Sequence, residues 1–145
     1  MEFINIWSCP GNAFLVHCVF YCRIICTAMN TIELKSTLNR MHEILKNHQS
    51  IETAWIESLI ELCESDETAL YAELNSKHMW GGAGSVANEA LADNKGIEDW
   101  IWQSEIKDYR ELMIALGEHL MSRGNAYPDI SSWLLAFNNW NQSQL

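Results

Sequence analysis

The chain contains 145 residues and carries a net charge of −10 at pH 7, with 48% hydrophobic and 19% charged residues. This composition excludes an intrinsically disordered chain, and the length suits a single domain with a buried core. Because phosphate groups repel an acidic protein, we do not expect nucleic acid or an anionic membrane as a direct partner. A protein with a basic surface is the favoured partner.

The first 28 residues differ in composition from the remainder. They hold four of the five cysteines but only one acid and one base, whereas residues 29–145 carry 18 acids and eight bases. Residues 13–28 form an apolar run, but this run contains Arg23 and is shorter than the roughly 20 residues that cross a bilayer. A secretory signal is also not expected, because no positive charge precedes the run.

The same segment gives no metal-binding pattern. Cys18, Cys22 and Cys26 recur every four residues, so a helix would place their thiols along one stripe, where they cannot surround a metal. Met29 is followed directly by a helix-start pattern. We therefore predict that translation starts at Met29 and that residues 1–28 lie outside the fold, as upstream sequence or as a poorly packed extension. The remaining cysteine, Cys63, fits a reducing cytoplasm.

Residues 29–145 have the pattern of amphipathic helices. Asn30 and Glu33 have the spacing of a capping box, and the apolar residues that follow recur every three or four positions, which predicts a helix to about Asn47. A further helix is predicted after its N-cap Ser50, with Ile51 on its apolar face, and others over 66–75 with Ser65 as cap and over 85–91. Ser104 is predicted to cap a helix that ends at Gly124 in a left-handed stop, and Asp129 to cap the last helix. No segment alternates as a strand does. We predict an all-α fold, an antiparallel bundle of four to five helices with a glycine-rich turn in the middle.

The charge of this domain is concentrated in one stretch. No lysine or arginine occurs from Asn47 to Ser76, while seven acids do. In the helix after Ser50, several acids lie opposite the apolar stripe, so we expect a ridge of like charge that faces solvent. The residues predicted to bind a basic partner are this ridge, its acidic neighbours and three tryptophans in or beside loops: Glu57, Glu61, Glu64, Asp66, Glu67, Trp80, Trp100 and Trp102.

The other tryptophans have a different expected role. Trp55, Trp133 and Trp140 fall on the apolar stripes of predicted helices and are expected in the core. The tryptophans in or beside loops would be harder to bury, which favours a protein-recognition patch. A role in covering helix ends is the alternative for these rings.

The turn Trp80-Gly81-Gly82-Ala83-Gly84-Ser85 is the sharpest local motif. Its backbone amides could face an anion, so Gly81, Gly82, Gly84 and Ser85 form an alternative ligand-binding site. A phosphate-binding loop requires a lysine where Ser85 stands, and a nucleophile elbow requires a glycine where Ala87 stands. The competing interpretation is a packing turn that lets Trp80 fold over a helix end.

No catalytic or metal-binding set can be assembled from the sequence. His42, His48, His78 and His119 are scattered, no Glu-x-x-His pair occurs, and each histidine is expected at the surface or half-buried. Cys63 has no histidine near it in sequence, so we expect it to pack rather than to react. We predict no enzymatic activity, no metal and no cofactor.

Three motifs of the middle and end of the chain stand out together. They are the turn Trp80–Ser85 followed by Val86–Leu91, then RELMIALGEHLMSRG at Arg110–Gly124 and WLLAFNNW at Trp133–Trp140. In these motifs the chain resembles a bacterial family of small, helical, functionally uncharacterised proteins, over roughly residues 30–142. The family brings no active site to carry over. Proteins similar to it in size and acidity include immunity proteins that neutralise toxins.

We therefore expect a cytoplasmic protein-interaction module of the immunity or antitoxin type, a monomer or small homo-oligomer, whose acidic helices bind a basic protein. Attraction between such surfaces raises the association rate and selects the partner. The alternative hypothesis is a helical domain that binds a small ligand or anion at the glycine-rich turn. Neither hypothesis involves nucleic acid or a membrane.

Overall fold

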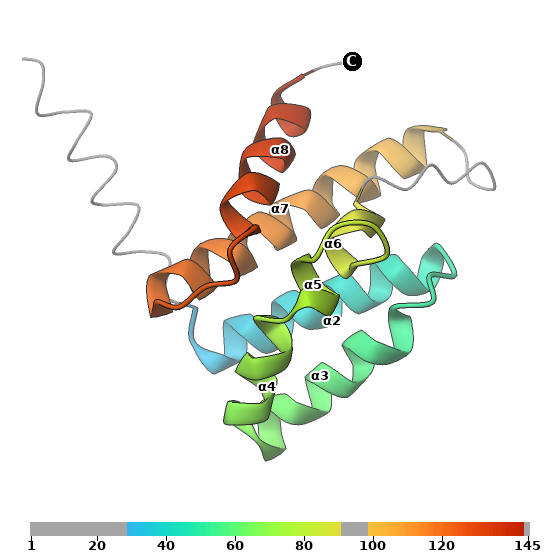
Figure 1. Ribbon diagram of the computed structural model, residues 1–145. Coiled ribbons are helices and arrows are strands. Elements are labelled where there is room, and N and C mark those ends of the chain that lie inside the picture. Colours follow the sequence, from blue (N-terminus) through green and yellow to red (C-terminus); the bar gives the residue numbers. More distant parts are fainter. Residues whose placement is uncertain (1–28, 91–98, 144–145) are drawn as a thin grey trace, which may run out of the picture.

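The computed structural model of the protein describes residues 29–90 and 99–143, and in these ranges it is built from helices without any strand (Figure 1). The helices are α2 (Thr31–Asn47), α3 (Thr53–Ser65), α4 (Glu67–Leu74), α5 (Lys77–Trp80), α6 (Val86–Glu89), α7 (Asp99–Arg123) and α8 (Ile130–Gln142). The prediction of an all-α fold is confirmed. The predictions for residues 1–28 lie outside the described residues.

The start of α2 follows the predicted capping box. Oδ1 of Asn30 accepts a hydrogen bond from N of Glu33 at 2.9 Å, and Oε2 of Glu33 accepts one from N of Asn30 at 2.9 Å. These bonds satisfy backbone amides that the first turn would otherwise leave without partners. The inward face of the helix carries Leu34, Leu38 and Met41, each at most 1% exposed.

The next two helix starts differ from the prediction. Ser50 lies before the N-cap of α3, where its hydroxyl accepts N–H of Glu52 at 3.1 Å, and Ile51 is 89% exposed instead of facing the core. Asp66, not Ser65, caps α4, because its carboxylate accepts an amide N–H of the first turn at 3.0 Å. The ionised carboxylate is the stronger acceptor of the two neighbouring side chains.

The longest helix also starts earlier than predicted. Ser104 lies inside α7, which begins at Asp99, so the prediction that Ser104 caps it is wrong. No glycine or proline stands between these two residues, so nothing stops the helix from extending. At the other end, Gly124 adopts a φ of +80°, the predicted left-handed stop. Asp129 stands at the N-cap of α8 as predicted, but its side chain makes no capping bond.

The helices enclose one interior. α2 packs against α3 and α7, and α7 packs against α8, while the short helices α5 and α6 lie between α2 and α7 in the view of Figure 1. The same view shows α8 crossing α7. The antiparallel arrangement of the bundle stays a prediction. Within residues 29–90 and 99–143, no helix has both the length and the apolar character needed to cross a membrane.

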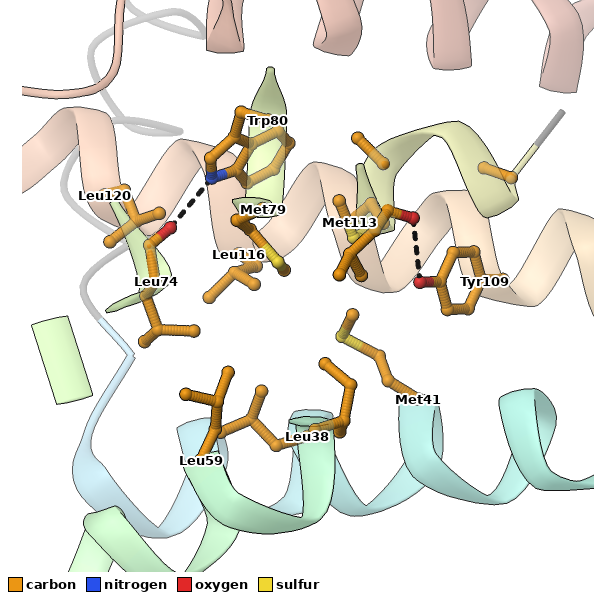
Figure 2. Close-up of a cluster of buried hydrophobic side chains, with 14 of the residues drawn as sticks. Leu38, Met41, Leu59, Leu74, Met79, Trp80, Tyr109, Met113, Leu116 and Leu120 are labelled. Atoms are coloured by element: carbon orange, nitrogen blue, oxygen red, sulfur yellow. Dashed lines mark hydrogen bonds between the residues drawn. The ribbon is translucent and has the colours of Figure 1, made fainter. Parts of the chain in front are cut away.

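The two largest rings of the core have their polar atoms satisfied. Trp80 is wholly buried and its Nε1 donates to the backbone oxygen of Leu74 at 2.9 Å, which ties α5 to α4. The hydroxyl of Tyr109 donates to the backbone oxygen of Val86 at 3.2 Å, which ties α7 to α6. Figure 2 shows the two rings on either side of Met113. The interior therefore combines apolar packing with hydrogen bonds that orient its rings.

Candidate functional site

The five acidic side chains predicted to bind a partner are exposed on α3 and around the start of α4: Glu57, Glu61, Glu64, Asp66 and Glu67. Their position follows from the helical period, because the opposite side of α3 carries Ile56 and Leu59, which are wholly buried. We call these five residues the acidic face.

Two cations from distant parts of the chain reach the acidic face. Nζ of Lys35 on α2 bonds to Oε1 of Glu64, and this contact lowers the pKa of Glu64 below its ordinary value. Nη2 of Arg123 at the end of α7 lies 3.8 Å from Oε1 of Glu67. The stretch from Asn47 to Ser76 contains no lysine or arginine, but the surface that it forms is not free of positive charge. Lys35 of α2 and Arg123 of α7 contact its carboxylates.

The remaining acids of the face differ in their contacts. Oδ1 of Asp66 is used by the cap of α4. Glu57 and Glu61 lie one turn apart, and neither makes an ion pair within the part of the chain that the structure describes. The uncompensated negative charge is therefore concentrated on the outer side of α3.

The tryptophans predicted to accompany these acids do not join them. Trp80 is wholly buried, so its assignment to a partner-binding surface is wrong: the one-turn helix α5 directs the ring into the core. Trp100 is 70% exposed, but it lies on the first turn of α7, at the opposite end of that helix from Arg123, which reaches Glu67. The side chain of Trp102 lies outside the described residues. The structure thus brings neither Trp80 nor Trp100 to the acidic face.

The tryptophans predicted for the core are only partly buried. Trp55 and Trp133 are half-buried, and the indole of Trp133 donates to the backbone oxygen of Trp80 at 2.7 Å, which links α8 to α5. Trp140 is 39% exposed and lies 5.3 Å from the guanidinium carbon of Arg110. The prediction of a core position is wrong for Trp140, because its ring packs on the guanidinium of Arg110 at the solvent-exposed edge of the contact between α8 and α7.

The glycine-rich segment connects α5 to α6. Gly82 and Gly84 adopt φ values of +92° and +79°, which glycine tolerates without strain. Ser85 is 3% exposed and its hydroxyl accepts an amide N–H of α6 at 3.3 Å. The amides of Gly81 and Ser85 donate to backbone oxygens earlier in the chain, and α6 has only four residues. These contacts favour a packing turn, and the anion site stays a prediction.

Two buried polar side chains, His119 and Glu52, make contacts that were not predicted from the sequence. His119 is 2% exposed, its Nδ1 accepts N–H of Met29 at 3.0 Å, and its Nε2 lies 2.8 Å from the hydroxyl of Tyr71. The expectation of a surface or half-buried position is wrong for this histidine. Elsewhere, Oε2 of Glu52, a residue 6% exposed, lies 2.6 Å from Nε2 of His78.

The position of His119 has a signal in the sequence. It follows Leu116 by three residues, which places it on the apolar side of α7. Its partners could not be predicted, because they lie 90 and 48 residues away along the chain. Contacts of this kind depend on how the helices pack.

The described residues give no support for metal or thiol chemistry. No group of three or more His, Cys, Asp or Glu side chains in these ranges is placed to hold a metal ion. Cys63 is half-buried, and burial raises the pKa of its thiol. A raised pKa leaves less of the reactive thiolate at neutral pH.

Comparison with protein-family models, curated proteins and solved structures finds no match to this chain. The resemblance noted in the sequence stays a prediction. Function must therefore be inferred from the surface and the contacts of the chain itself.

Proposed function

We propose that the protein is an interaction module whose outer α3 surface binds a basic protein. The observation that carries this proposal is the pair Glu57 and Glu61, exposed and without an ion pair in the described residues. Glu64 and Glu67 beside them already have cationic partners. A lysine or arginine of a partner would meet no competing intramolecular cation at the first two carboxylates.

Electrostatic attraction to such a surface raises the association rate and the selectivity for a partner more than it raises the affinity. A net charge of −10 attracts cationic partners and repels acidic ones, and physiological salt screens the attraction over about 8 Å. Like charges one turn apart also destabilise a helix by about 0.2–0.5 kcal/mol per pair. A cation placed between Glu57 and Glu61 would remove this repulsion.

We also propose how the helices hold the α3 surface and in which compartment the protein acts. The short connections between α2 and α3 and between α7 and α8 support an antiparallel bundle, with the glycine-rich turn at its middle. Such a bundle would hold α3 as a rigid outer element. We place the protein in the cytoplasm, without enzymatic activity. We also infer that it blocks its basic partner, as immunity and antitoxin proteins do.

The test compares charge reversals on two helices of the full chain. Glu57→Lys with Glu61→Lys alters α3, and Glu111→Lys with Glu118→Lys alters α7 by the same change in net charge. Glu111 and Glu118 also make no ion pair among the described residues. Partners are recovered from the native host with each protein, and the association rate of the recovered partner is then measured at low and high salt.

We expect the α3 variant to bind a basic partner at least about tenfold more slowly than the wild type at low salt. The α7 variant should retain most of the rate, which would show that position matters and not net charge alone. A neutral or acidic partner, or equal losses in the two variants, would contradict the proposal.

A further inference from the structure

Arg123 lies on an aromatic ring and a carboxylate of α4. Its guanidinium carbon is 3.6 Å from the centroid of the Tyr71 ring, and its Nη2 is 3.8 Å from Oε1 of Glu67. Tyr71 and Glu67 lie one helical turn apart, so they share a face of α4. We call these two residues the α4 site. The chain itself shows that a guanidinium fits this site.

The chemistry of the α4 site favours arginine over lysine. A guanidinium is planar and weakly hydrated, so it can stack on an aromatic ring while its N–H groups face a carboxylate. An ammonium group is more strongly hydrated and has no flat face to place on the ring. The hydroxyl of Tyr71 lies 2.8 Å from Nε2 of His119, and this contact helps to fix the orientation of the ring.

Another arginine could replace Arg123 at little cost. The side chain of Arg123 is 47% exposed and that of Glu67 is 70% exposed. Exposed ion pairs and exposed cation–π contacts each contribute little free energy. Arg123 is also the last residue of α7, so its side chain can turn into solvent without loss of buried packing.

We propose that the α4 site recognises an arginine of the basic partner, and that Arg123 occupies the site until the partner binds. This role rests on the proposed function, because Glu67 belongs to the acidic face, and it adds the kind of side chain that the partner presents. The two binding surfaces are continuous, since only Asp66 separates α3 from α4. Competition from Arg123 lowers the apparent affinity by the fraction of α4 sites that are free.

The experiment measures the affinity of the full chain for two short peptides of equal charge, one of arginine and glycine and one of lysine and glycine. Arg123→Gln empties the α4 site. Lys107→Gln is the control, because Lys107 is exposed on α7, makes no ion pair within the described ranges and gives the same change in net charge.

We expect Arg123→Gln to bind the arginine peptide about threefold to tenfold more tightly than the wild type does. For the lysine peptide, its gain should equal the small gain of Lys107→Gln, which comes from net charge alone. An equal gain for the two peptides, or no gain beyond that of the control, would overturn the proposal.

Substitutions in the α4 site separate the ring from the carboxylate. In the Arg123→Gln background, Tyr71→Phe keeps the ring and should keep the preference for the arginine peptide, whereas Tyr71→Leu should abolish it. Glu67→Gln should weaken the binding of both peptides. A preference for arginine that survives Tyr71→Leu would contradict the role of the ring.

A measurement on the wild type decides the matter even if Tyr71→Leu does not fold. Because the guanidinium lies over the Tyr71 ring, the ring current should shift the NMR signals of the Arg123 δ protons upfield. Saturation with the arginine peptide should return these signals to the values of a solvated arginine, and saturation with the lysine peptide should not. Signals that stay shifted in both titrations would overturn the proposal.

Failure of the α4 site differs from failure of the α3 surface. If reversal of Glu57 and Glu61 leaves the association rate of the partner unchanged while Arg123→Gln gains affinity for the arginine peptide alone, the proposed function fails and the α4 site stands. If the reversal slows association but Arg123→Gln shows no preference for arginine, only the α4 site fails.

Discussion

The interior around Trp80 contains buried side chains, whereas the acidic face of α3 and α4 contains exposed ones. The contacts of the two regions are determined in different ways. Around Trp80, indole hydrogen bonds join α5 to α4 and α8 to α5, and close packing restricts the conformation of the buried side chains. On the acidic face the side chains are exposed, and whether a negative charge is compensated depends on whether Lys35 or Arg123 reaches it. Substitutions in the interior should therefore change the free energy of unfolding, and substitutions on the acidic face should change titration and binding.

Truncation of Trp80 should have the largest effect. Trp80→Ala removes a wholly buried indole and leaves the backbone oxygen of Leu74 without its donor. We expect a loss of about 3–5 kcal/mol in the free energy of unfolding, measured by urea denaturation. Leu135→Ala is the matched control, because that side chain is 65% exposed, and it should change stability by no more than about 0.5 kcal/mol. Similar losses in the two variants would show that the interior is not packed as described.

A smaller effect is expected where α7 meets α8. Gly117→Ala would gain about 1 kcal/mol in an exposed helix, but here the added Cβ would lie 2.7 Å from Cδ2 of Leu134 and 3.2 Å from Cη2 of Trp80. Because overpacking typically costs about 1–3 kcal/mol, we expect a net loss of about 1 kcal/mol.

The contact with Leu134 can be isolated in a double-mutant cycle. A Leu134→Ala background removes the shortest of these contacts but leaves Cγ2 of Ile130 at 3.1 Å and Cη2 of Trp80 at 3.2 Å from the added Cβ, so Gly117→Ala should then cost less stability than it does in the wild type. Urea unfolding of the four proteins measures this coupling. If Gly117→Ala has the same effect in both backgrounds, α7 and α8 do not approach each other at this point.

The acidic face gives the smallest expected effect on stability, because exposed ion pairs contribute little. The bond to Lys35 lowers the pKa of Glu64, so its contribution is present at neutral pH and is lost as the pH falls through the lowered value. Lys35→Met should raise the pKa of Glu64 towards its ordinary value of 4.5. Carboxyl NMR titration measures the shift. An unchanged pKa would mean that Lys35 does not reach the acidic face in solution.

The local features of the fold were predictable from short stretches of sequence. Asn30 and Glu33 form their capping box, and Gly124 ends α7 in the left-handed conformation. These features depend on residues within one helical turn, so the sequence around them contains the needed information. The start of α7 was predicted wrongly at Ser104, because a capping residue does not end a helix whose preceding residues are also able to form one.

The candidate site was predictable only in part. The exposure of Glu57 and Glu61 follows from their place opposite the apolar stripe of α3. The sequence does not show which acids lack a cationic partner, because Lys35 is 29 residues from Glu64 along the chain. The burial of Trp80 and the contacts of His119 have the same origin, since both depend on helices that meet only after the chain has folded.

By itself the sequence determined that the described residues fold into helices without strands, where several of these helices begin and end, and which side of α3 faces water. These properties arise from backbone capping and from a period of 3.6 residues, which act over a few positions. Only the tertiary structure decided which tryptophan lies in the core, which carboxylates receive a cation and which histidine is buried. Hydrogen bonds and ion pairs act over a few ångströms in space, so they depend on the packing that brings distant residues together.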